Sequence, residues 1–365
     1  MAFSFFKKKK KKENTDSRYI DLTVKEVVKE TKDAVTLVFE QPESGELNYR
    51  PGQFITLILT IDGKKVRRAY SLCSAPSLGE LPAVTVKAVD GGIMSNFINN
   101  EVKAGDNIQI MEPMGSFVLD IDASDKKQVF LFGGGSGVTP LMSIAKSILK
   151  NETDSKVVLV YANRDIDSII FKSAIESLEE EYKGRLEVVH FLETPTADWT
   201  GHVGYMTKEK LISIITELKD SNYSDFSFMT CGPEPLMNIV WESLEELKIP
   251  DDKKFKESFV AGNTSPSAII ADANGSKEVT ILLEGEEYTY EVPANKTILE
   301  AGLDQNIDMP YSCQSGLCTA CRGKCLQGTI KMDEDDGLSD EEKAEGYVLL
   351  CVGHPESDDV KVEIG

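Results

Sequence analysis

Four cysteines near the C-terminal end of the sequence constrain the fold of this chain more than any other feature. Cys313, Cys318 and Cys321 form a C-x4-C-x2-C motif, and Cys351 follows after 29 further residues. Five of the seven cysteines lie within residues 313–365, whereas a secreted disulfide framework is usually a short chain that is rich in cysteine throughout. We therefore expect reduced thiols, a cytoplasmic protein, and a metal site that brings Cys351 beside the loop of the other three cysteines.

The residues around these cysteines indicate which metal centre they hold. The loop YSCQSGLCTACRG (311–323) is rich in Ser, Gly, Thr and Ala, so its backbone can wrap closely around a cluster and direct N–H groups at the sulfurs. Three ligands from one loop and a fourth from a distant segment form the spacing of a [2Fe–2S] cluster. The alternative is a structural zinc site, which usually has two C-x2-C pairs, and here only one occurs. Cys325 could substitute as a ligand, but we expect a free thiol because Cys351 completes the spacing.

Composition and charge exclude other classes of protein. The 365 residues, 41% of them hydrophobic, predict two or three domains with buried cores. No apolar run approaches the roughly 20 residues of a spanning helix, and we expect no secretory signal. The net charge of −21 disfavours nucleic-acid binding. Residues 276–365 carry 20 acidic against 7 basic side chains, a net charge of −13, which predicts a partner with a basic surface.

The first residues have the opposite charge. Residues 1–17 contain six consecutive lysines, Lys7 to Lys12, beside Phe3, Phe5 and Phe6, and are expected to form a disordered basic tail. Contact of this tail with an anionic membrane surface is the alternative.

The pattern of apolar residues divides the rest of the chain. Residues 18–122 contain short β-branched runs with turn residues between them, which predicts an antiparallel barrel or sandwich. Residues 123–262 alternate strand and helix patterns, with helices over 140–150, 168–182 and 235–248, which predicts a parallel sheet covered by helices. Residues 263–275 have the composition of a linker, and residues 276–365 form a last compact unit that begins with two strands over 278–292.

Two segments outside the cysteine loop have the chemistry of a cofactor site. GGGSGVTP (133–140) follows a buried strand and opens a helix, so its backbone can approach a pyrophosphate at the helix N-terminus. Pro140 stands in place of the third glycine of the usual dinucleotide fingerprint, and a simple tight turn is the alternative. Arg68, Tyr70, Ser71 and Ser74 end a barrel strand, where a guanidinium suits phosphate, an aromatic ring stacks on a flat ligand and a hydroxyl bonds a ring nitrogen.

Taken in order, these motifs resemble a known family. RAYS (68–71), GGIMSNFI (91–98), GGGSGVTP, YANR (161–164), TCGPEPLM (230–237) and KESF (256–259) occur as in the ferredoxin–NADP reductase-like superfamily, and the C-terminal block resembles plant-type ferredoxins. The fusion order is similar to that of the reductase components of bacterial oxygenases. The resemblance implies a Greek-key β-barrel that binds FAD, a Rossmann-like α/β domain that binds a nicotinamide, and a β-grasp ferredoxin domain.

The resemblance also implies roles for individual residues. Arg68 would hold a flavin phosphate, Tyr70 would stack on the isoalloxazine and Ser71 would lie near its N5 atom. The remaining implied flavin contacts are Val86, Lys87, Ala88, Gly92, Met94 and Ser95. The implied nicotinamide contacts are Gly133, Gly134, Gly135, Ser136, Gly137, Thr139, Asn163, Arg164, Cys231, Gly232 and Pro233. Phe259 would cover the other flavin face with Glu257 close by, and ordinary packing is the less favoured alternative for Cys231 and Phe259.

The sequence also gives expectations for the nicotinamide nucleotide, the order of electron transfer and the protein acceptor. Arg164 at the end of the second strand of the α/β unit favours NADPH over NADH, against the opposing charge of Asp165 and Asp167. Flavin is the cofactor that accepts a hydride and releases single electrons, so the expected order is NAD(P)H, flavin, [2Fe–2S] and a protein acceptor. An oxygenase component such as phenylacetyl-CoA epoxygenase is the expected acceptor, met by the acidic face of Asp333, Glu334, Asp335 and Asp336. The reductase of a membrane fatty-acyl desaturase and a zinc-stabilised interaction module are the alternatives.

Overall fold

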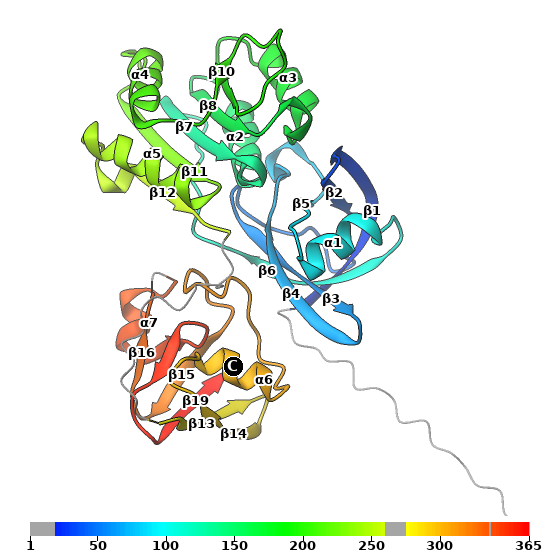
Figure 1. The fold of residues 1–365 in the computed structure, drawn as a ribbon, viewed down its shortest axis with the longest axis vertical. Coiled ribbons are helices and arrows are strands. Elements are labelled where there is room, and N and C mark those ends of the chain that lie inside the picture. The colour runs from blue at the N-terminus through cyan, green and yellow to red at the C-terminus, as the bar shows by residue number, and fades with distance from the viewer. Residues whose placement is uncertain (1–18, 260–274, 336, 365) are drawn as a thin grey trace, which may run out of the picture.

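Three β-sheet units, each from a different part of the sequence, make up the chain in a computed structural model that describes residues 19–259, 275–335 and 337–364 (Figure 1). We call them the barrel unit, the α/β unit and the C-terminal unit. The multidomain fold expected from the sequence is confirmed. The expected basic tail, the linker apart from residue 275, and Asp336 lie outside the described residues.

The barrel unit is a six-stranded antiparallel sheet in the order β4-β3-β6-β1-β2-β5. A bridge between Leu72 and Val84 joins its two ends. Helix α1 (Ile93–Asn100) contributes Met94 and Ile98 to the buried core inside the barrel, because these residues lie one turn apart on the same helix face. The strands are β1 (Tyr19–Thr31), β2 (Ala34–Phe39), β3 (Phe54–Ile61), β4 (Lys64–Ser71), β5 (Ala83–Lys87) and β6 (Asn107–Met114).

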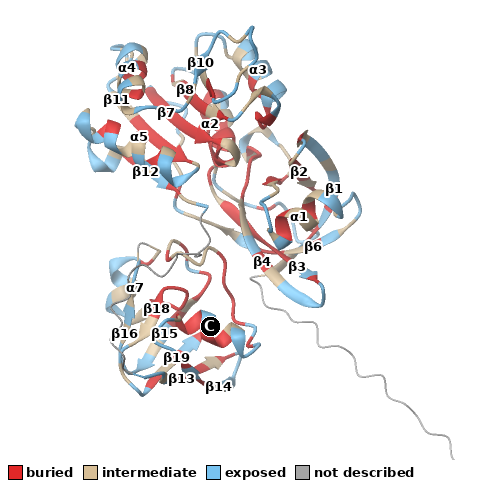
Figure 2. Cartoon of the chain, in the orientation of Figure 1, coloured by how far each residue is buried: buried red, intermediate tan, exposed pale blue. Residues whose placement is uncertain are grey.

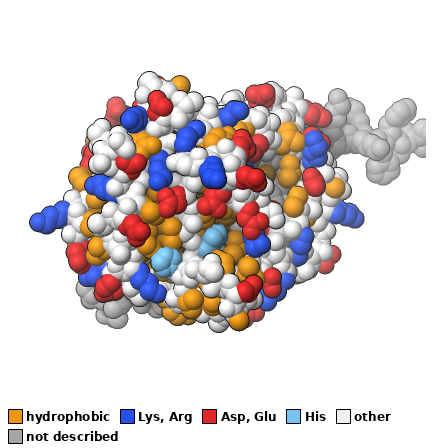
Figure 3. All heavy atoms as spheres, turned by 90° about the horizontal axis from the view of Figure 1, so that it is seen from above, with side chains coloured by type: hydrophobic (Ala, Val, Ile, Leu, Met, Phe, Trp, Pro, Cys, Tyr) orange, Lys and Arg blue, Asp and Glu red, His pale blue; other side chains and the backbone are white. Residues whose placement is uncertain are grey.

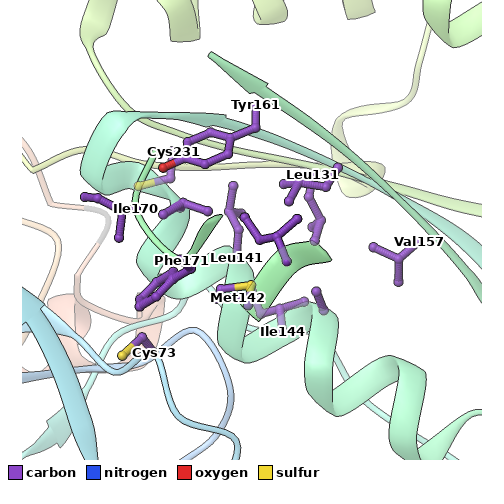
Figure 4. Close-up of a cluster of buried hydrophobic side chains, with 14 of the residues drawn as sticks. Cys73, Leu131, Leu141, Met142, Ile144, Val157, Tyr161, Ile170, Phe171 and Cys231 are labelled. Carbon is purple, nitrogen blue, oxygen red and sulfur yellow. The ribbon is translucent and has the colours of Figure 1, made fainter. Parts of the chain in front are cut away.

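The α/β unit is built on a parallel sheet in the order β10-β9-β8-β7-β11-β12. One apolar core lies under α2 and α3 and the other under α4 and α5, so the central strands β7 and β8 are buried along both faces. Figure 4 shows the first core, where side chains of α2 meet those of the sheet beneath the glycine-rich turn. The strands are β7 (Lys127–Gly134), β8 (Lys156–Asn163), β9 (Leu186–Leu192), β10 (His202–Val203), β11 (Asp225–Cys231) and β12 (Lys254–Glu257). The helices are α2 (Val138–Asn151), α3 (Lys172–Glu181), α4 (Lys208–Leu218) and α5 (Glu234–Glu246).

The structure corrects the helix that the sequence predicts over 168–182. Residues Ile166–Ser168 form a short 3-10 turn, and α3 begins only at Lys172. Phe171 has a φ angle of 61°, in the left-handed region, which separates the two elements. Ile169, Ile170 and Phe171 are buried in the α2-side core, so packing of these three side chains accounts for the departure from helix.

The C-terminal unit has a mixed five-stranded sheet in the order β14-β13-β19-β15-β17, with α6 packed on it. The hairpin of β13 and β14 and the parallel pairing of β13 with β19 give the β-grasp arrangement that was expected. Its elements are β13 (Lys277–Leu283), β14 (Glu286–Val292), α6 (Ile298–Asp304), β15 (Arg322–Gln327), β16 (Ile330–Met332), α7 (Asp340–Ala344), β17 (Tyr347–Leu349), β18 (Gly353–Pro355) and β19 (Val360–Ile364).

The C-terminal unit packs against the barrel unit by way of its cysteine loop. Cys318 and Ala320 join a buried apolar cluster with Phe54, Ile58 and Met111 of the barrel strands. Buried residues of that loop face the barrel in Figure 2. Within the described residues, no helix is long and apolar enough to cross a membrane.

The end of the α/β unit that is turned upward in Figure 1 carries interspersed acidic and basic side chains (Figure 3).

Candidate functional site

A pocket lies where the three units meet. The barrel contributes Phe54, Arg68, Ala69 and Ser71, and the segment that leaves the barrel contributes Gly115, Ser116 and Phe117. The end of the α/β unit contributes Lys256, Glu257, Ser258 and Phe259, and the cysteine loop contributes Ser312, Cys313, Ser315 and Leu317. The pocket therefore brings four residues expected at the flavin, namely Arg68, Ser71, Glu257 and Phe259, to the same space as one expected iron ligand.

Strand β4 presents the RAYS segment in the alternating way of a strand. Arg68 is exposed, and its Nη1 atom donates to the carbonyl oxygen of Arg67 at 2.7 Å. Tyr70 packs against the barrel core, and this burial raises the pKa of its hydroxyl, partly opposed by Arg68. Ser71 is buried at the end of the strand, where its hydroxyl donates to Glu257 Oε2 at 3.3 Å.

Ser74 lies apart from this group. Its hydroxyl is 2.6 Å from that of Tyr49 and accepts the amide of Ala83, while its carbonyl accepts the Ser143 hydroxyl. The side chain thus joins barrel segments to each other.

Glu257 and Cys231 end neighbouring parallel strands and are paired in register. Glu257 is 9% exposed, and burial raises the pKa of its carboxyl to about 8 although the Ser71 hydrogen bond lowers it. Burial, with a smaller contribution from Glu257, raises the pKa of the Cys231 thiol. Both groups therefore hold their protons at neutral pH, so Glu257 is a neutral acid that can donate a hydrogen bond or a proton.

The glycine-rich turn after β7 and the Cys-Gly-Pro turn after β11 are in backbone contact. A Cβ atom on Gly137 would lie 2.1 Å from the carbonyl oxygen of Cys231, and one on Gly134 would lie 2.7 Å from Pro233 Cδ. Gly232 has a φ angle of 155°, and its own Cβ would lie 2.9 Å from the Gly134 nitrogen. These two turns follow adjacent strands whose covering helices lie on opposite faces, which is the position where α/β sheets bind nucleotides.

The outer side of the same turn faces the barrel. Gly135 has a φ angle of 53°, and only the Lys87 Nζ atom would lie within 4 Å of a Cβ there, at 3.8 Å. The structure thus brings together two residues, Lys87 of β5 and Gly135, that the resemblance assigns to cofactor contacts. Such an open glycine beside a lysine has the donor chemistry that a phosphate requires.

The other expected flavin contacts lie around the N-terminus of α1. Gly92 is the N-cap of this helix, and the Ser95 hydroxyl accepts the Val89 amide at 3.1 Å. Met94 is 2% exposed and Val86 is fully buried, so both side chains fill the barrel core. Only their backbone atoms can face a cofactor. Ala88, after β5, donates its amide to Asp33.

The remaining nicotinamide positions lie at the end of β8 and the start of α2. Asn163 is buried at the last position of β8, and the exposed Arg164 donates from Nε to Asp165 Oδ2 at 2.9 Å. Thr139 is buried and its hydroxyl donates to the Ser136 carbonyl, which holds the turn in shape. Gly133 lies under the turn, where a Cβ would meet Leu141 at 3.1 Å.

The four expected metal ligands come together in the C-terminal unit. The sulfurs of Cys313 and Cys318 are 3.2 Å apart, and the amide of Ser315 donates to Cys313 at 3.5 Å. Interaction with Cys313 and Cys321 raises the pKa of the Cys351 thiol, so the fourth cysteine lies beside two of the others. The Cys325 sulfur donates to the Gln327 carbonyl, and within the described chain it has no hydrogen bond to the sulfurs of these four cysteines, so it is not needed as a ligand.

The shape of the loop fits a [2Fe–2S] cluster. Gly316 has a φ angle of 74°, and a Cβ there would lie 2.8 Å from the Glu334 carbonyl oxygen. Three thiolates from a tightly turned loop and a fourth from a distant segment, with a backbone amide directed at one sulfur, are the donor set of such a cluster. No three His, Cys, Asp or Glu side chains in the described chain are arranged to hold a single metal ion.

Several pocket residues could not be selected from the sequence. Phe54 and Phe117 belong to segments without a recognisable motif, whereas Ser312 and Leu317 lie in the cysteine loop but are not ligands, and all four reach the pocket because the units pack together. The small residues beside the cysteines were the one available signal for Ser312.

Comparisons with known proteins identify all three units. Family models match residues 21–119 as an oxidoreductase FAD-binding domain, residues 131–242 as an oxidoreductase NAD-binding domain and residues 281–356 as a 2Fe-2S iron-sulfur cluster binding domain. The expectations of FAD, a nicotinamide and a [2Fe–2S] cluster are confirmed at this level.

Curated relatives align with this chain along nearly its whole length. The ferredoxin reductase component of 3-ketosteroid-9-alpha-monooxygenase from Rhodococcus rhodochrous is 36% identical over 360 residues, covering 95% of this chain and 97% of that protein. One component of 1,2-phenylacetyl-CoA epoxidase from Escherichia coli is 33% identical over 345 residues, covering 94% of this chain and 96% of that protein. Among solved structures, phthalate dioxygenase reductase superposes with a TM-score of 0.61 at 24% identity, covering 96% of this chain and 99% of that one, and supports the fold.

Proposed function

Because this chain belongs to the family of FAD-, NAD- and [2Fe–2S]-binding reductase components of oxygenases, we propose that it passes electrons from NADPH to one oxygenase component. We also propose the domain limits 18–122, 123–262 and 276–365, with the linker at 263–275. The observation that carries the proposal is the pocket shared by Ser71, Glu257 and Cys313.

The chain's own residues have distinct tasks in this proposal. When bound, the flavin supplies the change from a two-electron hydride donor to single electrons, and the cluster supplies a one-electron carrier. The proposed task of Arg68 and Lys87 is to bind phosphates, and that of Tyr70 is to stack on the flavin ring. The proposed task of Ser71 and the protonated Glu257 is to hold a hydrogen-bonded proton near the reacting ring atoms. Phe259, which is 44% exposed, would exclude water from the opposite ring face.

The proposed nicotinamide site is formed by the two turns in backbone contact. Gly134, Gly137 and Gly232 allow the close approach of the turns, and Cys231 and Pro233 would border the reacting end of the nicotinamide. The neutral thiol of Cys231 would add no charge beside the nicotinamide.

Arg164 supports the proposed preference for NADPH. Its pairing with Asp165 through Nε holds the guanidinium at the end of β8, where the ribose of a dinucleotide lies in folds of this type. The change Arg164→Ala is expected to raise KM for NADPH by about tenfold and to leave KM for NADH within about twofold, since one charge-assisted contact is removed. Equal increases for both nucleotides would contradict the choice of NADPH. Steady-state kinetics with each nucleotide provides the measurement.

We also propose which oxygenase component accepts the electrons, and therefore which substrate is finally oxidised. The steroid monooxygenase and phenylacetyl-CoA epoxidase relatives are of similar identity, at 36% and 33%. We retain phenylacetyl-CoA epoxygenase as the first acceptor to test, with the 3-ketosteroid monooxygenase oxygenase component as the matched alternative. Product formation with only the steroid enzyme would replace the first choice.

The central experiment is an anaerobic absorption titration of the purified chain. We expect one flavin, two irons and two sulfides per chain. NADPH is expected to bleach the flavin bands first and the iron–sulfur bands afterwards. A colourless protein with bound zinc would contradict the proposal and support an interaction module instead.

A further inference from the structure

One carboxylate of the C-terminal unit bridges two cations of the barrel unit. Asp308 Oδ1 accepts a hydrogen bond from Arg67 Nη1 at 2.6 Å, and Asp308 Oδ2 accepts one from Lys65 Nζ at 2.6 Å. The Arg67 guanidinium also lies over the ring of Tyr311, 5.3 Å from the ring centroid. Both oxygens of Asp308 are therefore used by a strand of another unit, more than 240 residues away in sequence.

Because Arg67 is buried, the docked interface is stable only when a carboxylate pairs with its guanidinium. The Arg67 side chain is 3% exposed, whereas those of Lys65 and Asp308 are 44% and 54% exposed. A buried guanidinium is stable only with a partner, and Asp308 is the carboxylate that provides one. Burial alone would raise the pKa of Asp308, but the hydrogen bonds from Arg67 and Lys65 lower it overall, so Asp308 is ionised at neutral pH.

This ion-pair contact lies beside the cysteine loop, in the same interface through which the barrel covers that loop. Ser312 and Thr56 hydroxyls are 2.5 Å apart across the interface, and Cys318 and Ala320 pack on apolar barrel side chains. Cys321 and Cys351 are buried in the C-terminal unit's own core. Cys313 and Cys318 therefore lie on the side of the cysteine loop that packs against the barrel.

We propose that Lys65, Arg67 and Asp308 form a releasable latch, and that a protein acceptor takes electrons from the loop face 312–320 after the barrel has left it. Asp308 is then a positioning residue, which holds the cluster loop at the flavin-side pocket. This inference rests on the proposed function. The acceptor that replaces the barrel would offer a basic side chain to Asp308, as Lys65 and Arg67 do.

The direct test measures opening of the interface in the full chain by hydrogen exchange of backbone amides in the 308–320 loop. In Asp308→Asn, Arg67 loses its charged partner when docked, so we expect exchange of this loop to be about tenfold faster, in proportion to the opening equilibrium. Asp304→Asn is the matched control, because Asp304 is 56% exposed and pairs with Lys296 inside the same unit. Equal exchange in the two variants would overturn the latch.

A kinetic test follows electrons in the same variants. With saturating NADPH, flavin bleaching is expected to be unchanged in Asp308→Asn, while iron–sulfur bleaching slows several-fold and Asp308→Glu restores part of the rate. Cytochrome c serves as the one-electron acceptor. In a second protein, a carbodiimide joins the interface by forming an amide between Lys65 and Asp308. We expect this joined chain to reduce cytochrome c no longer, while NADPH still bleaches its iron–sulfur bands. Undiminished cytochrome c reduction by the joined chain would refute acceptor access through this face. Absence of flavin or iron in the wild-type chain would refute the proposed function instead.

Discussion

At the end of β12, Glu257 is nearly buried and its carboxyl group accepts a hydrogen bond from Ser71. Burial, more than any neighbouring charge, raises the pKa of this carboxyl from 4.5 to about 8. A carboxyl with a raised folded-state pKa binds more protons when folded than when unfolded between these two values, so its unfavourable effect on stability grows as the pH rises through that window.

This sign gives a measurable pH dependence. Between about pH 5 and about pH 8, we expect the melting temperature of the wild-type chain to fall more steeply than that of Glu257→Gln. The corresponding slopes of the unfolding free energy against pH differ by at most about 1.4 kcal/mol per pH unit. Thermal melts of both proteins at matched ionic strength provide the measurement. Parallel pH profiles would show that Glu257 does not titrate in this window.

The two cysteines beyond the C-x4-C-x2-C motif offer a matched pair of substitutions. Cys351→Ser is expected to reduce iron and sulfide to well under half of the wild-type content, because a hydroxyl replaces a thiolate beside Cys313 and Cys321. Cys325→Ser should leave iron content unchanged, since the Cys325 sulfur contacts the Gln327 carbonyl. If Cys325→Ser lost iron and Cys351→Ser retained it, Cys325 would be the fourth ligand in place of Cys351.

The positions of single residues were predictable where the local sequence pattern indicates one kind of site. Cys313, Cys318 and Cys321 share one loop, and Gly135 lies in a turn between a strand and a helix, so spacing was sufficient. Ser74 differs, because its hydroxyl bonds to Tyr49 and Ala83 depend on the folded barrel and could not be predicted from its place near RAYS.

At the scale of elements, the junction of β7 with α2 depends on its contact with the turn after β11. The sequence predicted the strand, the turn and the helix, but not that Gly137 lies against the Cys231 carbonyl. The late start of α3 was also unpredictable, because it depends on the burial of three apolar side chains that are compatible with helix by propensity.

The contact of the two turns predicts the effect of one methyl group. Gly137→Ala would place Cβ 2.1 Å from a backbone oxygen, which must push the turns apart. We expect a loss of about 3 kcal/mol in stability and an increase of at least about tenfold in KM for NADPH. Gly184→Ala is the control, because Gly184 has a φ angle of 83° but open space around Cβ, so only the backbone cost of about 1 kcal/mol applies. Denaturant titrations and steady-state kinetics would compare them; equal stability losses would show that the turns can separate freely.

At the scale of the whole molecule, the charge of the C-terminal unit predicts how it meets an acceptor. Asp333, whose side chain is 64% exposed, lies 3.1 Å from His354 Nε2, and Asp335 forms an ion pair with Lys343, so one charge of the acidic run is balanced within the unit. Fold and domain order were predictable from periodicity and motif order. The packing of the units was not, because the Arg67–Asp308 pair joins residues 241 positions apart.

Charge steering can be separated from chemistry by varying salt. Raising ionic strength is expected to slow the bimolecular step with a basic acceptor several-fold and to leave flavin bleaching at saturating NADPH unchanged. Asp333→Asn should lower the association rate about twofold and weaken its salt dependence, whereas Glu242→Gln on α5, in the α/β unit, should do neither. Stopped-flow mixing with the oxygenase component measures both. A uniform response of both steps to salt would rule out steering by this face.

The Lys65–Asp308–Arg67 contact also has a consequence for concentration. The two units belong to one polypeptide, so each meets the other at an effective concentration on the order of millimolar for a short tether. An interface of one bridging carboxylate, one hydroxyl contact and a few apolar side chains is small for two separate proteins, but the tether offsets much of the cost of association. Dilution in the cell therefore leaves the balance of docked and open forms unchanged, whereas a competitor for the same surface shifts it toward the open form.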